Sequence, residues 1–567
     1  MSRNKNKKKK KEHFNDLIIP IILILCVMPF VIRMAEYDYG FGKYPWHSEN
    51  SVMQDFYTYY RSIFFITVIC IVVAILAFWL LLYRGRIKPS KIFFPLLIYG
   101  ALALISSVLS VNTKASFMGN LSYESVFVLL GYVVIAFYTY QILDKENDYK
   151  VIVRAVMIMF TLMSIVGWFQ VFRHDMLNSE WVQKLVMNNE QFAEYGGMIG
   201  DVFTGNNVFL SLYNPNYAAI FLVMFASVFA VFLLEAKTRK ERVLFAVYLA
   251  DALVLCWFTY TRAALVAFVA VAVLFVMCLR EKDKRIGVSV IFAGVVFIVI
   301  GLVCVDGITG GRYINRMIDK SKTTKLENIE TKTKGVEITY DGRKYILTME
   351  AVKDGEIQLP FSEGCYATSI EWDGETILML YIENYTLQFI KKEDGYYYYT
   401  EWGKTDKMSA CESVDFGGKE YLGSGRVYIW SRVLPLLKHY IIVGSGPDTF
   451  AEVYPQDDYV GKMIYSESTA RIIEGAHNDY LMRWVQTGLV SLISILVFYV
   501  LFFVKCFRHY SRCSMNRLDE KLGFGCFLGC NAYMVCSIFS DSTLYTTPIF
   551  YIFIGIALSV IYRKENE

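Results

Sequence analysis

The sequence predicts an all-α polytopic membrane protein with a small all-β module inserted in a large extracytoplasmic loop. Hydrophobic residues make up 55% of the 567 residues and charged residues only 19%. The mean hydropathy is positive, which is unusual for a soluble globular protein. A bilayer about 30 Å thick needs about 20 apolar residues per helix, and the chain contains about twelve such stretches.

The predicted spans form two groups, one on each side of the large loop. Arg262 divides the seventh span from the eighth, and Asp541 divides the eleventh from the twelfth. The spans are predicted at 17–34, 62–83, 92–111, 123–143, 151–172, 217–235, 243–260, 263–279, 286–305, 484–507, 522–539 and 544–562. The expected organisation is therefore a basic tail over 1–16, helices 1–9 within 17–305, a loop over 306–483, and helices 10–12 with a short tail within 484–567.

Lysine and arginine collect in alternate connections between these spans. The basic segments are 3–11, 84–91, 237–242, 280–285, 505–517 and 563–564. All of them fall on one side of the predicted arrangement, so both termini are expected on the cytoplasmic side of the inner cell membrane. No small-residue cleavage site follows the first apolar run, which indicates a retained anchor. The lysines of the basic tail are interpreted as solvated topology signals, in preference to binding of nucleic acid or of specific lipids. The expected partners of the spans are the surrounding membrane lipids, and no nucleic acid is expected.

Two long connections, 173–216 and 306–483, are expected on the outer side, where long loops tend to carry function. Within the second, residues 335–412 are predicted to form an antiparallel β module of about six strands. Its hairpin signals are Asp341-Gly342, Asp373-Gly374 and Asp394-Gly395. The part of the loop that is expected to carry the candidate catalytic residues is 424–483.

The cysteines suit this placement. Only Cys365 and Cys411 lie in the large outer loop, where they either form a disulfide or remain buried thiols. The sequence has no Cys-x-x-Cys or His-x-x-x-His spacing and no Asp-x-Asp pair. We therefore expect no metal site and no cofactor, and a metal-dependent nucleotide-sugar enzyme is disfavoured.

His477 is the leading candidate for catalysis. It stands with Asn478 and Asp479 where an outer loop enters the predicted tenth span. A helix N-terminus there disfavours imidazolium and keeps a neutral base available. Against this, a lone histidine is often structural, and Asn478 or Asp479 also suits a helix cap.

Two arginines are candidates for binding an anion. Arg262 interrupts a long apolar stretch, so it either snorkels at the interface or binds a lipid-linked phosphate. Arg426 and Trp430 share one face of a predicted amphipathic helix, whereas Arg432 points elsewhere. The alternative for Arg426 is a solvated interfacial side chain. Gly444 and Gly446 then predict a tight turn, which would either cradle phosphate or be purely structural.

These residues resemble the O-antigen ligase family. The resemblance rests on Arg426 and Trp430, on Gly444-Ser445-Gly446-Pro447 with Phe450 and Tyr454-Pro455, on Ala476-His477-Asn478-Asp479-Tyr480-Leu481, and on Thr487-Gly488-Leu489. It continues upstream in Asn214-Pro215-Asn216, in Thr261-Arg262-Ala263 and, more weakly, in Gly119 to Glu124. Departures are Asp448 in place of a small residue, Met482 in place of glutamine, Ser125 in place of glycine, and the β module.

The resemblance implies metal-independent, inverting transfer of a glycan from an undecaprenyl diphosphate carrier to an acceptor hydroxyl on the outer face of the cytoplasmic membrane. The acceptor of such an enzyme is a glycan, a lipid or a protein. The β module then either binds an acceptor glycan or wall polymer, or is only a tolerated insertion. Under this reading His477 is the catalytic base, and Arg262 and Arg426 bind the diphosphate. Candidate substrate-binding residues are Asn214, Asn216, Asn478, Asp479 and Trp430; for both Asn214 and Asn216 the alternative is capping the sixth span.

Three other readings stay open at the level of sequence. A polysaccharide polymerase would use the same motifs. A non-enzymatic exporter of lipid-linked glycan would need cations for diphosphate, and it predicts charged residues in the middle of several spans. A membrane sensor whose β module binds wall fragments would not require His477.

Overall fold

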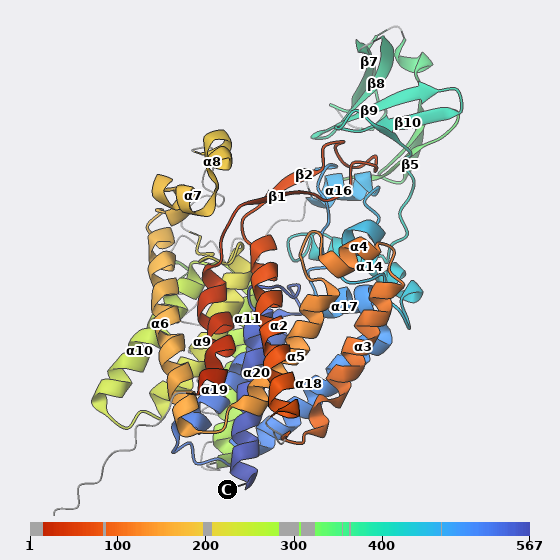
Figure 1. The fold of residues 1–567 in the computed structure, drawn as a ribbon. Helices are drawn as coiled ribbons and strands as arrows, with labels where there is room; N and C mark the ends of the chain where they lie inside the picture. The colour runs from red at the N-terminus through yellow and green to blue at the C-terminus, as the bar shows by residue number, and fades with distance from the viewer. Residues whose placement is uncertain are drawn as a thin grey trace, which may run out of the picture.

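The computed structural model describes residues 15–82, 87–196, 207–282, 306–307, 324–353, 355–361, 364–372, 374–466 and 468–566. A bundle of long helices forms one end of the molecule and a β module projects from the other (Figure 1). The bundle contains α2 (Tyr59–Leu81), α3 (Phe94–Val108), α5 (Val126–Ile142), α6 (Glu146–Val171), α9 (Pro215–Leu234), α10 (Arg239–Trp257), α11 (Arg262–Lys282), α18 (Leu489–Tyr510), α19 (Leu518–Cys536) and α20 (Thr547–Asn566).

Within the described residues, seven helices are long and apolar enough to cross a membrane, which supports a multi-pass membrane protein. These are the helices of α2, α3, α6, α9, α11, α18 and α20, and two shorter apolar helices cover Asp16–Phe30 and Val126–Ile142. α10 and α19 occupy two more predicted positions but begin with charged residues. The predicted ninth span, 286–305, lies outside the described residues. The count of twelve therefore remains a prediction.

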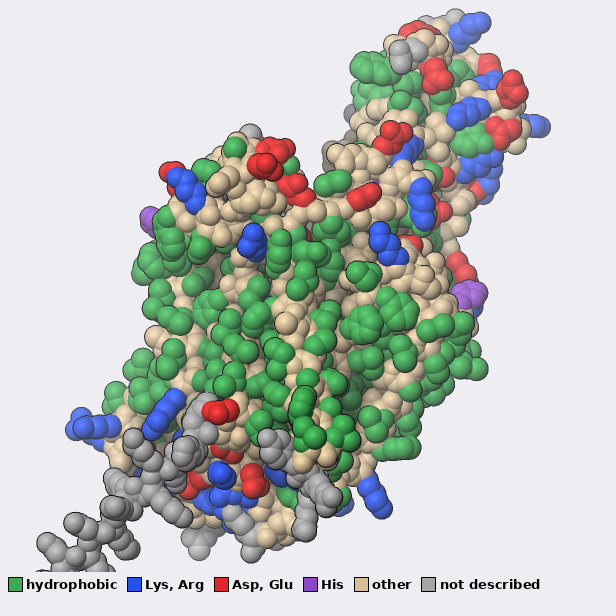
Figure 2. Space-filling model, in the orientation of Figure 1, with side chains coloured by type: hydrophobic (Ala, Val, Ile, Leu, Met, Phe, Trp, Pro, Cys, Tyr) green, Lys and Arg blue, Asp and Glu red, His purple; other side chains and the backbone are tan. Residues whose placement is uncertain are grey.

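The surface of the bundle suits a bilayer. On the face shown in Figure 2, a broad band of hydrophobic side chains covers the helices, and charged side chains gather above and below it. α9 and α20 are the most buried of the candidate spans, because α9 packs against α10 and α19 while α20 packs against α5 and α19. α2 packs mainly against α5, and α3 against α18, so these helices extend the bundle around the central ones.

The predicted tenth span begins later than expected. Residues 484–487 belong to a separate helix, α17 (Asp479–Thr487), and the span α18 begins at Leu489. Gly488 separates the two helices. Its φ is 93°, a backbone conformation that residues other than glycine rarely adopt. His477 therefore precedes a short helix that leads into the span, not the span itself.

The β module consists of two antiparallel sheets. The first has strands β3 (Leu326–Thr331), β4 (Val336–Tyr340) and β5 (Arg343–Leu347); the second has the order β11-β10-β9-β8-β7-β6. The strands of the second are β6 (Ile357–Gln358), β7 (Tyr366–Trp372), β8 (Glu375–Ile382), β9 (Tyr385–Lys392), β10 (Gly395–Tyr399) and β11 (Thr405–Asp406). The predicted number of about six strands was too low, because β3 precedes the first hairpin signal and the short β6 and β11 carry no turn signature.

The predicted hairpins can be compared with the strand registers. Tyr340 pairs with Arg343, which places Asp341-Gly342 in a two-residue turn, and Trp372 pairs with Glu375 around the second signal. In the third hairpin Gly395 itself pairs with Lys392, so the turn lies one residue earlier than predicted. Cys411 carries a free thiol, and the Cys365–Cys411 disulfide is not formed in the structure.

The module is fixed to the rest of the protein at two places. Its hydrophobic core continues into α16 (Tyr459–Ser466), where the rings of Tyr398 and Tyr459 lie 4.7 Å apart. On another side, Lys404 Nζ donates to the backbone carbonyls of Gly42, Tyr44 and His47 at 2.5, 3.0 and 2.9 Å. The module is therefore anchored to both α16 and an N-terminal loop.

Candidate active site

His477 contacts a carboxylate from a distant part of the chain. Its Nδ1 lies 3.2 Å from Asp541 Oδ2, and the two side chains are 41% and 12% exposed. The other carboxylate oxygen accepts the backbone N–H of Asn478 at 3.1 Å. With Nδ1–H donating to Asp541, the second ring nitrogen Nε2 keeps its lone pair and can accept a proton.

The loop that carries His477 is held closely against Asp541. A Cβ at Gly475 would lie 2.5 Å from Asp541 Oδ2, so only glycine permits this approach. His477 itself adopts a φ of 49°, a conformation that is uncommon for residues with a side chain and is often found at functional sites.

Two further side chains hold the same loop. Trp430 Nε1 donates to the carbonyl of Ala476 at 2.8 Å. Gln456 holds Ile473 on both sides, since its Oε1 accepts the Ile473 N–H at 3.1 Å and its Nε2 donates to the Ile473 carbonyl at 2.8 Å. Trp430 therefore holds in place the backbone directly before the predicted base His477.

Asn478 and Asp479 have structural contacts. Asn478 caps α17, and its Oδ1 accepts the N–H groups of Tyr480 and Leu481, both at 3.0 Å. Asp479 is buried and pairs with Arg483 at 3.0 Å. These contacts favour the capping and packing alternatives over direct substrate binding.

The two candidate arginines converge on one short segment. Arg262 is the first residue of α11, and its Nη2 donates to Ser424 Oγ at 2.8 Å. Arg426 is the first residue of α14 (Arg426–Leu436), and its Nη1 donates to the carbonyl of Gly423 at 2.9 Å. Residues 423–426 therefore connect the two guanidinium groups.

The electrostatics of Arg426 place it beside both Arg262 and Asp541. Burial and the positive charge of Arg262 lower the pKa of Arg426, and the Asp541 carboxylate opposes this shift. Among the described residues, no group makes a hydrogen bond with its buried Nε. Arg432 instead pairs with Asp458 at 2.8 Å. A partly buried cation with an unused buried donor, beside a second cation, is suited to an anionic ligand.

The Asn214-Pro215-Asn216 segment joins this region through Thr261. Asn214 caps α9, and its Oδ1 accepts the N–H of Asn216 at 2.9 Å. Asn216 Oδ1 in turn accepts a hydrogen bond from Thr261 Oγ1 at 3.3 Å. Asn216 therefore fixes the residue that precedes Arg262, while Asn214 has the capping role.

The turn that contains Gly444 and Gly446 is held by hydrogen bonds to other parts of the protein. The N–H groups of Gly444, Ser445 and Gly446 donate to Ser106 Oγ, the Val485 carbonyl and the Gln486 carbonyl at 3.0, 2.8 and 3.0 Å. These amides are already used within the protein, so they do not form a phosphate cradle.

From the sequence, Asp541 was predicted only as the boundary between the eleventh and twelfth spans. A lone carboxylate between two apolar stretches is costly near a membrane unless it has a partner, and this cost was the available signal. The partner itself could not be predicted, because it lies in another helix connection. Trp430 and Gln456 gave no signal for their contacts with the His477 loop.

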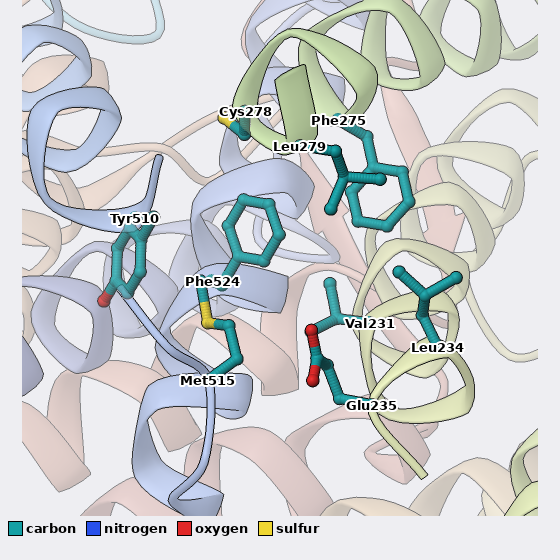
Figure 3. Close-up of a pocket in the computed structure, with 9 residues that line it drawn as sticks. All are labelled: Val231, Leu234, Glu235, Phe275, Cys278, Leu279, Tyr510, Met515 and Phe524. Atoms are coloured by element: carbon teal, nitrogen blue, oxygen red, sulfur yellow. The ribbon is translucent and has the colours of Figure 1, made fainter. Parts of the chain in front are cut away.

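A small pocket lies at the other end of the bundle. Its lining includes Leu234 of α9, Glu235 directly after that helix, Phe275 and Leu279 of α11, Phe524 of α19, and Met515, which precedes α19 (Figure 3). The cavity volume is about 10 Å³, which is barely enough for one water molecule. It cannot hold a glycan or a lipid diphosphate.

A family model described as O-Antigen ligase matches residues 243–496. The matched region contains Arg262, Arg426 and His477, whereas Asn214, Asn216 and Asp541 lie outside it. The match supports an assignment to the O-antigen ligase family through this part of the chain. It supports, in general terms, membrane glycosyl transfer of the ligase or polymerase type, for which a lipid-linked glycan and an acceptor are the partners that the family implies. No curated protein matches the chain.

Proposed function

We propose that this O-antigen ligase family member transfers a glycan from undecaprenyl diphosphate to an acceptor hydroxyl at the outer face of the cytoplasmic membrane. The observation that carries the proposal is the contact of His477 with Asp541, next to a pair of arginines that meet at residues 423–426. A base and an anion site are the two parts that this reaction needs.

In the proposed reaction the bond between the anomeric carbon and the diphosphate oxygen breaks, and a bond from the same carbon to the acceptor oxygen forms. The acceptor proton passes to His477 Nε2, and the electron pair of the broken bond stays on the diphosphate. Attack from the face opposite the leaving group inverts the anomeric configuration. No metal or cofactor takes part in these steps.

Arg262 and Arg426 are proposed to stabilise the negative charge that develops on the leaving diphosphate. Fixed cations in a partly desolvated site contribute several kcal/mol to such a step. Asp541 orients His477 and stabilises the imidazolium that forms when it accepts the proton. Asn216 is proposed to hold the Arg262 segment in place, and Trp430 to hold the His477 loop.

The location of these residues suits a lipid-linked donor. They come from the connections at the end of the bundle that carries the β module (Figure 1), which the charge distribution predicts to face outward. A polymerase would run the same chemistry with a growing glycan as acceptor. An exporter would have use for the arginines, but the close His477–Asp541 pair would serve no purpose in it.

The test replaces His477 with alanine in the full-length membrane protein and measures transfer from an undecaprenyl-diphosphate glycan. Loss of a general base lowers the rate by about 10²- to 10⁴-fold. His439→Ala is the matched control, because His439 is an exposed histidine of the same outer loop and should leave the rate unchanged. Transfer by His477→Ala at the wild-type rate would refute the proposed base.

A further inference from the structure

The connection between α19 and α20 carries Asp541, whose carboxylate contacts His477. One side of this connection is held by α17, because the backbone N–H of Asp479 donates to the carbonyls of Ser537 and Ser540 at 2.9 and 3.0 Å. Ser540 directly precedes Asp541 in the chain. The helix that follows His477 therefore fixes the backbone on the N-terminal side of its carboxylate partner.

The other side of Asp541 is held by a glutamate from a different part of the bundle. Ser542 Oγ donates to Glu124 Oε2 at 2.6 Å, and both side chains are buried. Glu124 lies just before α5, and its second oxygen, Oε1, accepts the hydroxyl of Tyr132 within that helix at 2.5 Å. Both neighbours of Asp541 along the chain are therefore held, one by α17 and the other by Glu124.

The segment that carries Glu124 is itself fixed. Asp448, which is buried, accepts the backbone N–H of Asn120 and both the N–H and the hydroxyl of Ser122. The two contacts with Ser122 measure 3.0 and 2.7 Å. Because the chain just before Glu124 and the helix just after it are both held, the carboxylate is a fixed support for the Ser542 hydroxyl.

Stability alone gives little reason for a glutamate at this position. The carboxylate receives hydrogen bonds from Tyr132 and Ser542, and among the residues that the structure describes no ion pair engages it. Burying a carboxyl group away from any cation partner is costly. What the glutamate adds is an acceptor oxygen for Ser542, the residue next to Asp541.

We infer that Glu124 is a positioning residue for the transfer reaction: by holding Ser542, it keeps the Asp541 carboxylate where it orients His477. Glu124 acts through Ser542 and not by direct contact with the base. The role requires an acceptor oxygen and not the negative charge, because the Ser542 hydroxyl is the donor. This inference rests on the proposed function and adds a residue to its machinery.

The experiment uses full-length protein, an undecaprenyl-diphosphate glycan as donor, and as acceptor the envelope fraction of cells that lack the gene. Ser542→Ala and Glu124→Leu each remove the hydrogen bond between the two side chains. Each should lower kcat about fivefold, as expected for one hydrogen bond, and leave the half-saturating amounts of donor and acceptor unchanged. The double variant should be no slower than the slower single variant, because both changes remove the same contact. Glu124→Gln keeps an acceptor oxygen for Ser542 and should retain kcat.

Tyr132→Phe is the matched control, because it removes the other hydrogen bond of the same carboxylate and leaves the contact with Ser542 in place. It should retain kcat even where it lowers the melting temperature. An unchanged kcat in Ser542→Ala, an equal loss of kcat in Tyr132→Phe, or Glu124→Gln as slow as Glu124→Leu would overturn the inference; Ser542→Ala decides it even if Glu124→Leu does not fold. Failure of the proposed function would appear differently, as no product from the wild-type protein or full activity in His477→Ala.

Discussion

Replacing Asp541 with asparagine tests the proposed mechanism most directly. One carboxylate oxygen faces His477 Nδ1 at 3.2 Å and the other accepts the Asn478 N–H at 3.1 Å. An amide of the same size has only one acceptor oxygen, so it can serve only one of these groups. An NH₂ group facing Nδ1 would favour the tautomer with the proton on Nε2, which cannot act as a base.

The size of the effect follows from the distance and the exposure. Two unit charges 3.2 Å apart attract by about 1 kcal/mol in water and by about 5 kcal/mol at an effective dielectric constant near 20. Because His477 is partly exposed and Asp541 nearly buried, we expect an intermediate value of about 2–4 kcal/mol for imidazolium stabilisation. At 1.36 kcal/mol per factor of ten, kcat should fall about 30- to 1000-fold.

The assay measures kcat at saturating acceptor for the wild type, Asp541→Asn, His477→Ala and the double variant. Residues that act as one unit lose activity non-additively, so the double variant should be no slower than His477→Ala. Asp541→Asn within about threefold of the wild type, with His477→Ala inactive, would show that the base works without its carboxylate and would refute the reasoning.

Two further predictions concern positioning and stability. Trp430→Phe keeps an aromatic ring but removes the N–H that donates to the Ala476 carbonyl. The loss of one hydrogen bond, about 1 kcal/mol, should lower kcat about fivefold and lower the melting temperature only slightly; an unchanged kcat would exclude this role. Lys462 is fully buried, and its Nζ lacks a hydrogen bond within the described structure. Burial lowers its pKa from 10.5 to about 8. Lys462→Met should therefore stabilise the fold by up to about 3 kcal/mol at pH 7. Because the buried lysine destabilises the fold fully below pH 8 and progressively less up to pH 10.5, the gain should shrink over that range; a lower melting temperature at pH 7 would contradict it.

Patterns local to the sequence predicted local structure well. Asp341-Gly342 forms a two-residue turn between paired strands, since such turns depend mainly on the two residues themselves. Apolar length predicted the seven helices that are long and apolar enough to cross a membrane among the described residues, because the cost of exposing polar backbone in a bilayer is large. The break at Gly488 was missed because an average over about 20 residues does not register one backbone conformation.

Contacts between distant segments were beyond the sequence. Nothing near Ser424 predicts its hydrogen bond with Arg262, and the partner of Asp541 depends on how the last two spans pack. Asp448 is a similar case. Its carboxylate accepts both the N–H and the hydroxyl of Ser122, at 3.0 and 2.7 Å, and so ties the glycine turn to the 119–124 segment. Its departure from the family pattern thus has a structural reason.

The positions of the two candidate arginines carry a further argument about the site. Arg262 and Arg426 are each the first residue of a helix, where the helix dipole already contributes positive charge. A cation is unfavourable there, and the second arginine and burial add to the cost for Arg426. An anion bound between the two helix starts would compensate both the side chains and the dipoles. If the two arginines hold the diphosphate, as proposed, its negative charge compensates their unfavourable placement, and the charge of the donor is then the feature that the two arginines recognise.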